Sequence, residues 1–264
     1  DLNSLESSTS TVQSVGIATP SNATLNKEVG TEYCQFNAEE LSNAILHIEV
    51  SALKEVIIKY CQFNEADYQT FMQFSLDQIK KSGVENVEEQ NVLEYFYHIS
   101  QVPIEEKIAY ILEKYRLTYE EFLFVAAVFM AEGKWESYLD VYAVTDTGKN
   151  RCKDGAYCID FGSNIYSQVM GRGQFSVIRD GRVYQFIGKT DMLAFQAVVD
   201  SLYSSISLHN CLEFRGTSEK NFSGLQFTPR GNRFGGRNIT FDVQGPMILE
   251  LPIQEEEYVK TLVP

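Results

Sequence analysis

The sequence predicts an α+β protein, with an N-terminal helical bundle followed by a mainly antiparallel β domain that has one covering helix. Residues 33–133 carry apolar residues at helical spacing, whereas residues 134–264 hold short alternating apolar and polar segments. Glycine favours turns over helix interiors, and it occurs four times in residues 1–133 but 13 times in residues 134–264. The first part has 8 basic against 21 acidic residues and the second has 14 against 15, so the negative charge is concentrated in the helical part.

Residues 1–32 show neither apolar periodicity nor an aromatic side chain. A segment of this composition cannot bury enough surface to offset its chain entropy, so we expect a flexible leader. The leader contains no charged end followed by an apolar stretch. A signal peptide is therefore expected to be either already removed or never present.

Helix boundaries between residues 33 and 133 are predicted from capping residues. Asn37, Asn64 and Thr118 can each accept a hydrogen bond from a free amide at a helix start, and an acidic residue follows each of them three positions later. Further start and stop signals are a capping asparagine, a first-turn proline and two glycines: Asn86, Pro103, Gly83 and Gly133. We expect five or six antiparallel helices across this part of the chain.

Strands are predicted where β-branched and aromatic residues form short runs after Trp135. These runs cover residues 138–144, 175–178, 183–187, 238–243 and 247–251. Asp180 and Gly181 stand between the second and third runs, a pattern typical of a β-hairpin turn. A stripe of apolar residues predicts one covering helix over about residues 190–207. The predicted domains are 33–133 and 134–264.

The composition excludes two broad classes of protein. A net charge of −14 repels a phosphate backbone, so we expect no general binding of nucleic acid. The longest uninterrupted apolar run covers residues 122–131 and is ten residues long. A membrane-spanning helix needs about 20 such residues, so we expect no membrane span.

Five cysteines are present, at Cys34, Cys61, Cys152, Cys158 and Cys211. Their odd number and mixed spacing, with only three histidines, do not fit a zinc site. Cys152 and Cys158 flank a turn-forming stretch, where a disulfide can form in an oxidising compartment. Cys34 and Cys61 can meet only if the chain turns back near Ser51. The alternative for all five is a free thiol that packs as a small apolar side chain.

His209 and Cys211 stand two residues apart, on one face of the chain if it is extended. A Cys–His nucleophilic pair is therefore one hypothesis for this region, and Cys158 with His209 is another. Neither pair has the flanking residues typical of cysteine hydrolases. We accordingly assign no catalytic residue and no metal ligand.

The segment 214–241 is rich in arginine and glycine in an otherwise acidic chain. Its basic residues are Arg215, Lys220, Arg230, Arg233 and Arg237, against the single acid Glu219. Guanidinium groups bind phosphate or carboxylate through two hydrogen bonds, and glycines let backbone amides curl around an anion. We interpret the segment as a loop that contacts an anionic group or a protein partner. The alternative is that these arginines pair with acidic residues of the same chain.

The string Phe214-Arg215-Gly216-Thr217 resembles the aromatic-Arg-Gly motif that opens the nucleotide site of mono-ADP-ribosyltransferases. The resemblance implies that Arg215 would hold the phosphates of a nicotinamide dinucleotide. It also implies that Glu255 or Glu257 would be the catalytic acid. This enzyme is the alternative to a binding function.

No phosphate loop, nucleophile elbow or zinc motif occurs in the sequence. We therefore expect a non-enzymatic protein without a cofactor, which acts by binding a protein partner. We expect it to be secreted, periplasmic or part of a secreted or viral particle. The oligomeric state and the identity of the partner are left open.

Overall fold

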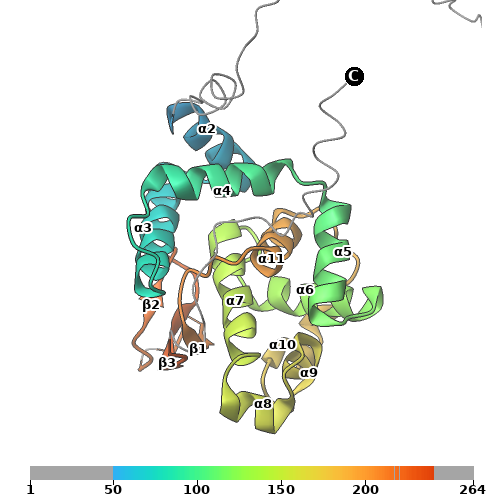
Figure 1. Ribbon diagram of the computed structural model, residues 1–264. Coiled ribbons are helices and arrows are strands. Elements are labelled where there is room, and N and C mark those ends of the chain that lie inside the picture. The colour runs from blue at the N-terminus through green and yellow to red at the C-terminus, as the bar shows by residue number, and fades with distance from the viewer. Residues whose placement is uncertain (1–49, 217, 220, 241–264) are drawn as a thin grey trace, which may run out of the picture. The chain divides into compact units, whose positions relative to one another are not determined.

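The structure is a computed structural model that describes residues 50–216, 218–219 and 221–240, all within one compact unit (Figure 1). It has the α+β fold that the sequence predicts. The helices are α2 (Val50–Cys61), α3 (Glu65–Lys81), α4 (Glu89–Gln101), α5 (Ile104–Tyr115), α6 (Tyr119–Glu132), α7 (Tyr138–Arg151), α8 (Gly155–Phe161), α9 (Ile165–Met170), α10 (Ser176–Arg179), the 3-10 helix η1 (Arg182–Gln185) and α11 (Leu193–Tyr203). The predicted leader, residues 1–32, lies outside the described residues.

The helix boundaries of the N-terminal part follow the predicted capping residues closely. Asn64 Oδ1 accepts a hydrogen bond from the Asp67 amide (2.9 Å), and Thr118 Oγ1 accepts one from the Glu121 amide (3.2 Å). The start predicted at Asn86 is wrong by two residues, because Glu88 caps α4 instead. Asn37 lies outside the described residues. No helix within the described residues has the length and apolar character needed to cross a membrane.

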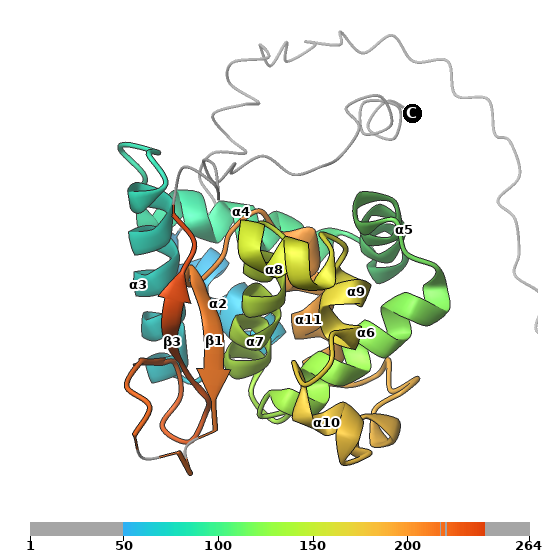
Figure 2. The same cartoon turned by 90° about the horizontal axis from the view of Figure 1, so that it is seen from below.

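Residues 138–144 form the first half of helix α7, so the strand predicted there is wrong. All fourteen residues of α7 are buried. A helix enclosed on every side has no polar face, so its sequence lacks the apolar stripe that identifies a surface helix. Figure 2 shows α7 between the sheet on one side and α11 with α6 on the other.

The two other runs predicted as strands before residue 190 are also wrong. Residues 176–179 form the one-turn helix α10 and residues 182–185 form η1. Gly181, at φ +79°, makes the turn between them, and the Arg182 amide donates to Asp180 Oδ1 (3.2 Å). Each piece buries one valine, at Val177 and Val183, and both pack against α6. The predicted covering helix is confirmed as α11.

The sheet is small and antiparallel, with strand order β1-β3-β2. Its strands are β1 (Cys211–Arg215), β2 (Leu225–Gln226) and β3 (Arg233–Asn238). Phe214 and Phe234 are paired in register and buried, and β1 lies against α7. The strand predicted over residues 238–243 overlaps β3 only at Asn238, and the run 247–251 lies outside the described residues.

The turn that leads into β3 is fastened to the first turn of α7. Asp140 is buried, and its two carboxylate oxygens accept hydrogen bonds from the Asn232 amide (2.8 Å) and side chain (2.9 Å). A Cβ atom at Gly231 would overlap Asp140 Oδ1, so the close approach requires glycine. The glycine-rich segment is thereby held against the helical core.

Candidate anion-binding site

The structure distributes the basic residues of segment 214–241 over the sheet. Arg215 and Arg233 are cross-strand partners on β1 and β3, Arg237 lies further along β3, and Arg230 is exposed on the turn before it. Lys220 lies outside the described residues. These side chains therefore do not converge on one point.

Arg215 and Arg233 both hold Phe222 against the sheet. The Arg215 guanidinium lies 5.8 Å from the Phe222 ring centroid, and Arg233 Nη1 donates to the Phe222 carbonyl oxygen (3.3 Å). Arg215 also forms ion pairs with Glu213 (3.5 Å) and Glu219 (3.6 Å). Both pairs are partly exposed, so each contributes little to stability.

Arg237 connects β3 to helix α8. Its Nη2 lies 2.6 Å from Asp154 Oδ1, and its guanidinium lies 5.7 Å from the Tyr157 ring centroid. Asp154 also caps α8, because its Oδ1 accepts a hydrogen bond from the Tyr157 amide (3.0 Å). The Arg237 side chain is nevertheless 52% exposed.

Arg151, the last residue of α7, is the unusual cation of this region. It is only 4% exposed, and its Nε donates to the Leu212 carbonyl oxygen (2.8 Å). The Tyr157 and Phe175 ring centroids lie 5.0 Å and 5.2 Å from the guanidinium. Its Nη1 has no hydrogen-bond partner, and no ion pair joins Arg151 to a carboxylate in the described part of the chain.

The electrostatic surroundings leave Arg151 incompletely compensated. Burial lowers the pKa of Arg151 and Arg215 lowers it further, whereas Tyr157, Glu213 and Glu132 act in the opposite direction. A guanidinium stays charged in proteins, so the result is a buried cation without an adjacent anion. Such a charge costs free energy unless a partner approaches it.

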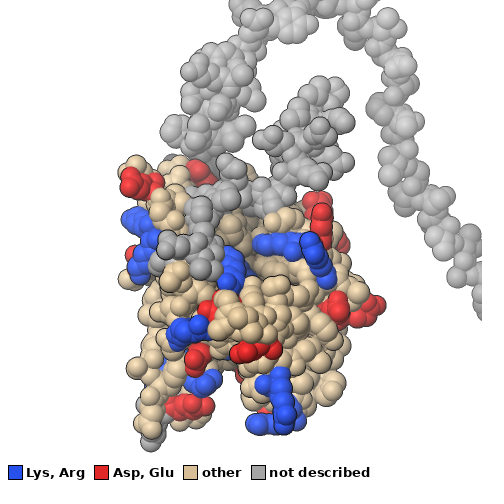
Figure 3. Space-filling model, turned by 60° about the horizontal axis from the view of Figure 1, so that its bottom comes forward, with Lys and Arg blue, Asp and Glu red and all other residues tan. Residues whose placement is uncertain are grey.

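We call the group formed by Arg151, Tyr157, Phe175 and Arg237 the Arg151 site. Tyr157 contacts both Arg151 and Arg237. Figure 3 shows basic and acidic side chains interspersed on the face in view, without one large basic patch. Recognition of an anion would therefore depend on a few placed guanidinium groups and not on a broad positive field.

Sequence reasoning missed Arg151 because it placed the residue beyond a predicted strand. The signal that could have found it is the helix start at Ser137, whose Oγ accepts a hydrogen bond from the Asp140 amide (3.3 Å). A helix from this cap runs through the buried segment and ends at Arg151.

The described cysteines, Cys61, Cys152, Cys158 and Cys211, are free thiols, and Cys34 lies outside the described residues. The disulfide expected between Cys152 and Cys158 is not formed, and Cys158 Sγ instead donates to the Cys152 carbonyl oxygen (3.1 Å). Burial raises the pKa of Cys152 to about 12 and also raises the pKa of Cys158. Both thiols are therefore poor nucleophiles.

His209 forms no nucleophilic pair with the Cys211 thiol. Its Nδ1 accepts a hydrogen bond from the Cys211 backbone amide (3.1 Å), and its Nε2 donates to the Ala143 carbonyl oxygen (2.8 Å). Burial also raises the pKa of the Cys211 thiol to about 11. No group of three potential ligands that could hold a metal ion occurs among the described residues.

The transferase alternative remains a prediction. Arg215 lies at the end of β1, where it is paired with Glu213 and Glu219, and Phe214 is buried in the core. Glu255 and Glu257 lie outside the described residues. No protein-family model, curated protein or solved structure matches this chain.

Proposed function

We propose that this protein acts by binding a partner through an anionic group, a carboxylate or a phosphate, received at the Arg151 site. The observation that carries the proposal is the buried Arg151 guanidinium, whose Nη1 has no hydrogen-bond partner among the described residues. Buried polar groups are almost always paired, so an unpaired one calls for a ligand, an ion or a water. An anion would supply both the missing charge and the missing acceptor.

The rim of the Arg151 site supports the same function. Arg237 is 52% exposed, whereas its partner Asp154 is buried, with a side chain 10% exposed. The Arg237 guanidinium has further N–H donors beside the one on Asp154, so it can bind a ligand without giving up this ion pair. Tyr157 and Phe175 lie beside the Arg151 guanidinium, which is itself buried, so an anion would have to reach Nη1 past the rim.

The test is a titration of the full chain with inorganic phosphate and with a hexaglutamate peptide, followed through the Arg Nε–Hε resonances by NMR. We expect a saturable shift of the Arg151 resonance in the wild-type protein. Arg151→Gln should abolish the saturable response to both probes. Arg237→Ala should weaken binding about tenfold, the effect of one lost charge-assisted hydrogen bond.

The matched control is Arg182→Ala. Arg182 is 50% exposed, close to the 52% of Arg237, and is paired with the exposed carboxylate of Asp180 (3.0 Å), but it lies on η1. This variant should bind the probes like the wild-type protein. An Arg151→Gln variant that binds with unchanged affinity, or an Arg182→Ala variant that loses binding, would exclude the Arg151 site as the receptor.

We also infer a protein as the carrier of the anionic group, and a secreted or periplasmic location. Counting reactive thiols in denaturant, with and without reductant, tests the location, because disulfides persist in oxidising compartments. Protein isolated from its source with four of five sulfurs unreactive would support the location, and would then differ from the structure, in which Cys61, Cys152, Cys158 and Cys211 are free thiols. Five reactive thiols would oppose it.

A further inference from the structure

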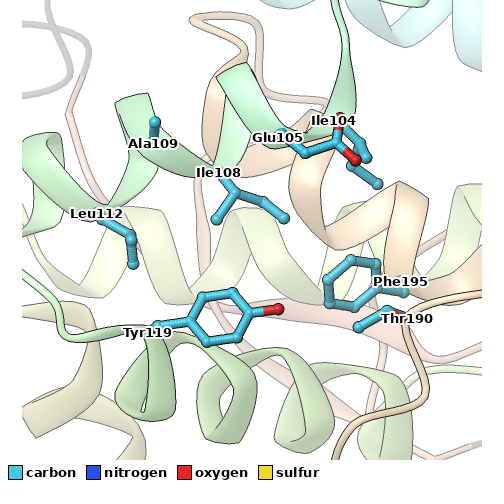
Figure 4. Close-up of a pocket in the computed structure, with 8 residues that line it drawn as sticks. All are labelled: Ile104, Glu105, Ile108, Ala109, Leu112, Tyr119, Thr190 and Phe195. Carbon is cyan, nitrogen blue, oxygen red and sulfur yellow. The ribbon is translucent and has the colours of Figure 1, made fainter.

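A cavity of about 380 Å³ lies between α5, the start of α6 and the segment that leads into α11 (Figure 4). Its α5 wall consists of Ile104, Glu105, Ile108, Ala109 and Leu112. Tyr119, Thr190 and Phe195 form the opposite side. Figure 4 shows Ile108 and Leu112 directed toward the Tyr119 ring, with Phe195 and Thr190 beyond its hydroxyl group.

The shape of this cavity suits a short apolar molecule. Ile104, Ile108 and Leu112 recur every four residues, so they form one apolar ridge along α5 about 12 Å long, at 1.5 Å per residue. Phe195 is buried at the base, whereas Tyr119 is 47% exposed at the mouth. The volume falls at the lower end of the range of small-molecule sites, roughly 300–1,000 Å³.

The charge around this cavity is negative. Glu105 is the one charged residue among the described lining residues, and its carboxylate stands at the Ile104 end of the groove (Figure 4). Glu120 and Asp191 follow lining residues in the sequence, and the cations Lys107 and Lys189 each precede one. The nearest buried cation on α5, Lys107, is already paired with Asp200 (2.7 Å).

We propose that this groove binds a small organic cation with an apolar body, an aryl- or alkylamine. The apolar part would lie along Ile104, Ile108 and Leu112, and the ammonium group would bind the Glu105 carboxylate. The hydroxyl groups of Tyr119 and Thr190 provide further acceptors at the mouth. This site is independent of the Arg151 site and has the opposite charge preference.

The experiment compares two probes that share an apolar body, 4-phenylbutylamine and 4-phenylbutanoate, titrated into the full chain labelled at the isoleucine δ1 methyl groups. We expect the amine to shift the Ile104 and Ile108 methyl resonances saturably and the carboxylate to bind at least about tenfold more weakly. Glu105→Gln should remove this preference. Ala109→Phe should fill the groove and abolish binding of the amine.

The matched control for the filled groove is Ala66→Phe, since Ala66 is likewise an exposed helical alanine but lies on α3. It should bind the amine as the wild-type protein does. All variants should have the same melting temperature as the wild-type protein. Equal binding of both probes, no binding of the amine, or full binding by Ala109→Phe would overturn the proposal. Self-association of the wild-type protein that Ala109→Phe abolishes would also overturn it, because the groove would then be a contact between copies.

Discussion

A buried cation lies near each end of the buried helix α7, and the two cations differ in how completely they are paired. Near its start, Tyr138 donates a hydrogen bond to Asp200 Oδ2 (2.8 Å), and Lys107 Nζ lies 2.7 Å from Asp200 Oδ1 and 2.9 Å from the Tyr60 hydroxyl. At its end, Arg151 has one backbone acceptor and an unpaired Nη1. A closed network, in which every buried polar group is paired, stabilises the fold. An open network, in which one group is unpaired, leaves that group available to a ligand.

The middle of α7 resembles its start. Asp146 is fully buried, and its oxygens contact Lys149 Nζ (2.9 Å), the Ser201 hydroxyl (2.9 Å) and the Leu208 amide (2.7 Å). The buried carboxylates Asp200, Asp146 and Asp140 are matched by nearby donors. Arg151 is the one buried cation of α7 that forms no ion pair in the described part of the chain, since Lys149 is paired with Asp146.

The largest loss of stability should come from removing one partner of the buried ion pair near the start of α7. Asp200→Asn removes the only carboxylate paired with Lys107 in the described residues and leaves a buried ammonium group uncompensated. We expect the free energy of unfolding to fall by about 3–5 kcal/mol, as when one partner of a buried pair is removed. Urea denaturation measures it, and a loss below about 1 kcal/mol would show that the pair does not hold this end together.

A smaller effect should appear with pH at the middle of α7, where His209 is held neutral. Burial lowers the pKa of His209 below 6.5, and its Nδ1 faces the Cys211 amide, so a proton there would oppose a donor. The unfolded chain then takes up the proton first. Stability is therefore lost as pH falls below about 6.5, by at most about 1.4 kcal/mol per pH unit.

The measurement is urea denaturation at pH 7, 6 and 5 of the wild-type protein and of His209→Gln, which keeps an amide donor and acceptor. Asp146 and Lys149 act on the His209 charge in opposite directions, and the Phe227 and Phe234 rings lie 5.6 Å and 4.8 Å from the imidazole. These neighbours remain in both proteins. Parallel pH curves for the two proteins would show that His209 contributes no pH dependence.

The sequence predicted the surface helices because each repeats a polar and an apolar face, as α3 does from its cap at Asn64. The largely buried helix α6 was predicted at its start by the cap at Thr118. The prediction failed at α7, where buried Asp140, Asp146 and Lys149 are interleaved with apolar residues. Those polar residues are satisfied by contacts from distant elements, such as the Leu208 amide. Contacts of this kind have no local periodicity to detect.

The candidate site was predicted in part for a related reason. Arg215 and Arg237 were visible as basic residues in a glycine-rich segment, and the structure places Arg237 against Tyr157 of the Arg151 site, whereas Arg215 contacts Glu213, Glu219 and Phe222. Arg151 became recognisable only when burial and the missing partner of its Nη1 were known. Composition therefore identified the exposed Arg237, whereas the buried Arg151 could be identified only from the tertiary packing.

The sharpest form of the comparison replaces the buried cation near each end of α7, Lys107 on α5 and Arg151 on α7 itself, by methionine. Lys107→Met leaves Asp200 as a buried anion and should cost about 3–5 kcal/mol, because one partner of a buried pair is lost. Arg151→Met strands no carboxylate, keeps the length of the stem, and loses mainly the bond to the Leu212 carbonyl oxygen. We expect it to change the free energy of unfolding by no more than about 1 kcal/mol.

Phosphate distinguishes the two variants further, because a ligand that binds only the folded protein stabilises it in proportion to the logarithm of its concentration. Wild-type protein and Lys107→Met should both gain stability as inorganic phosphate is raised at constant ionic strength, whereas Arg151→Met should not. The two results together separate a cation kept for the fold from one kept for a ligand. The contrary result would be an Arg151→Met variant that loses as much stability as Lys107→Met and is still stabilised by phosphate. Arg151 would then stabilise the fold as Lys107 does, and would not bind the ligand.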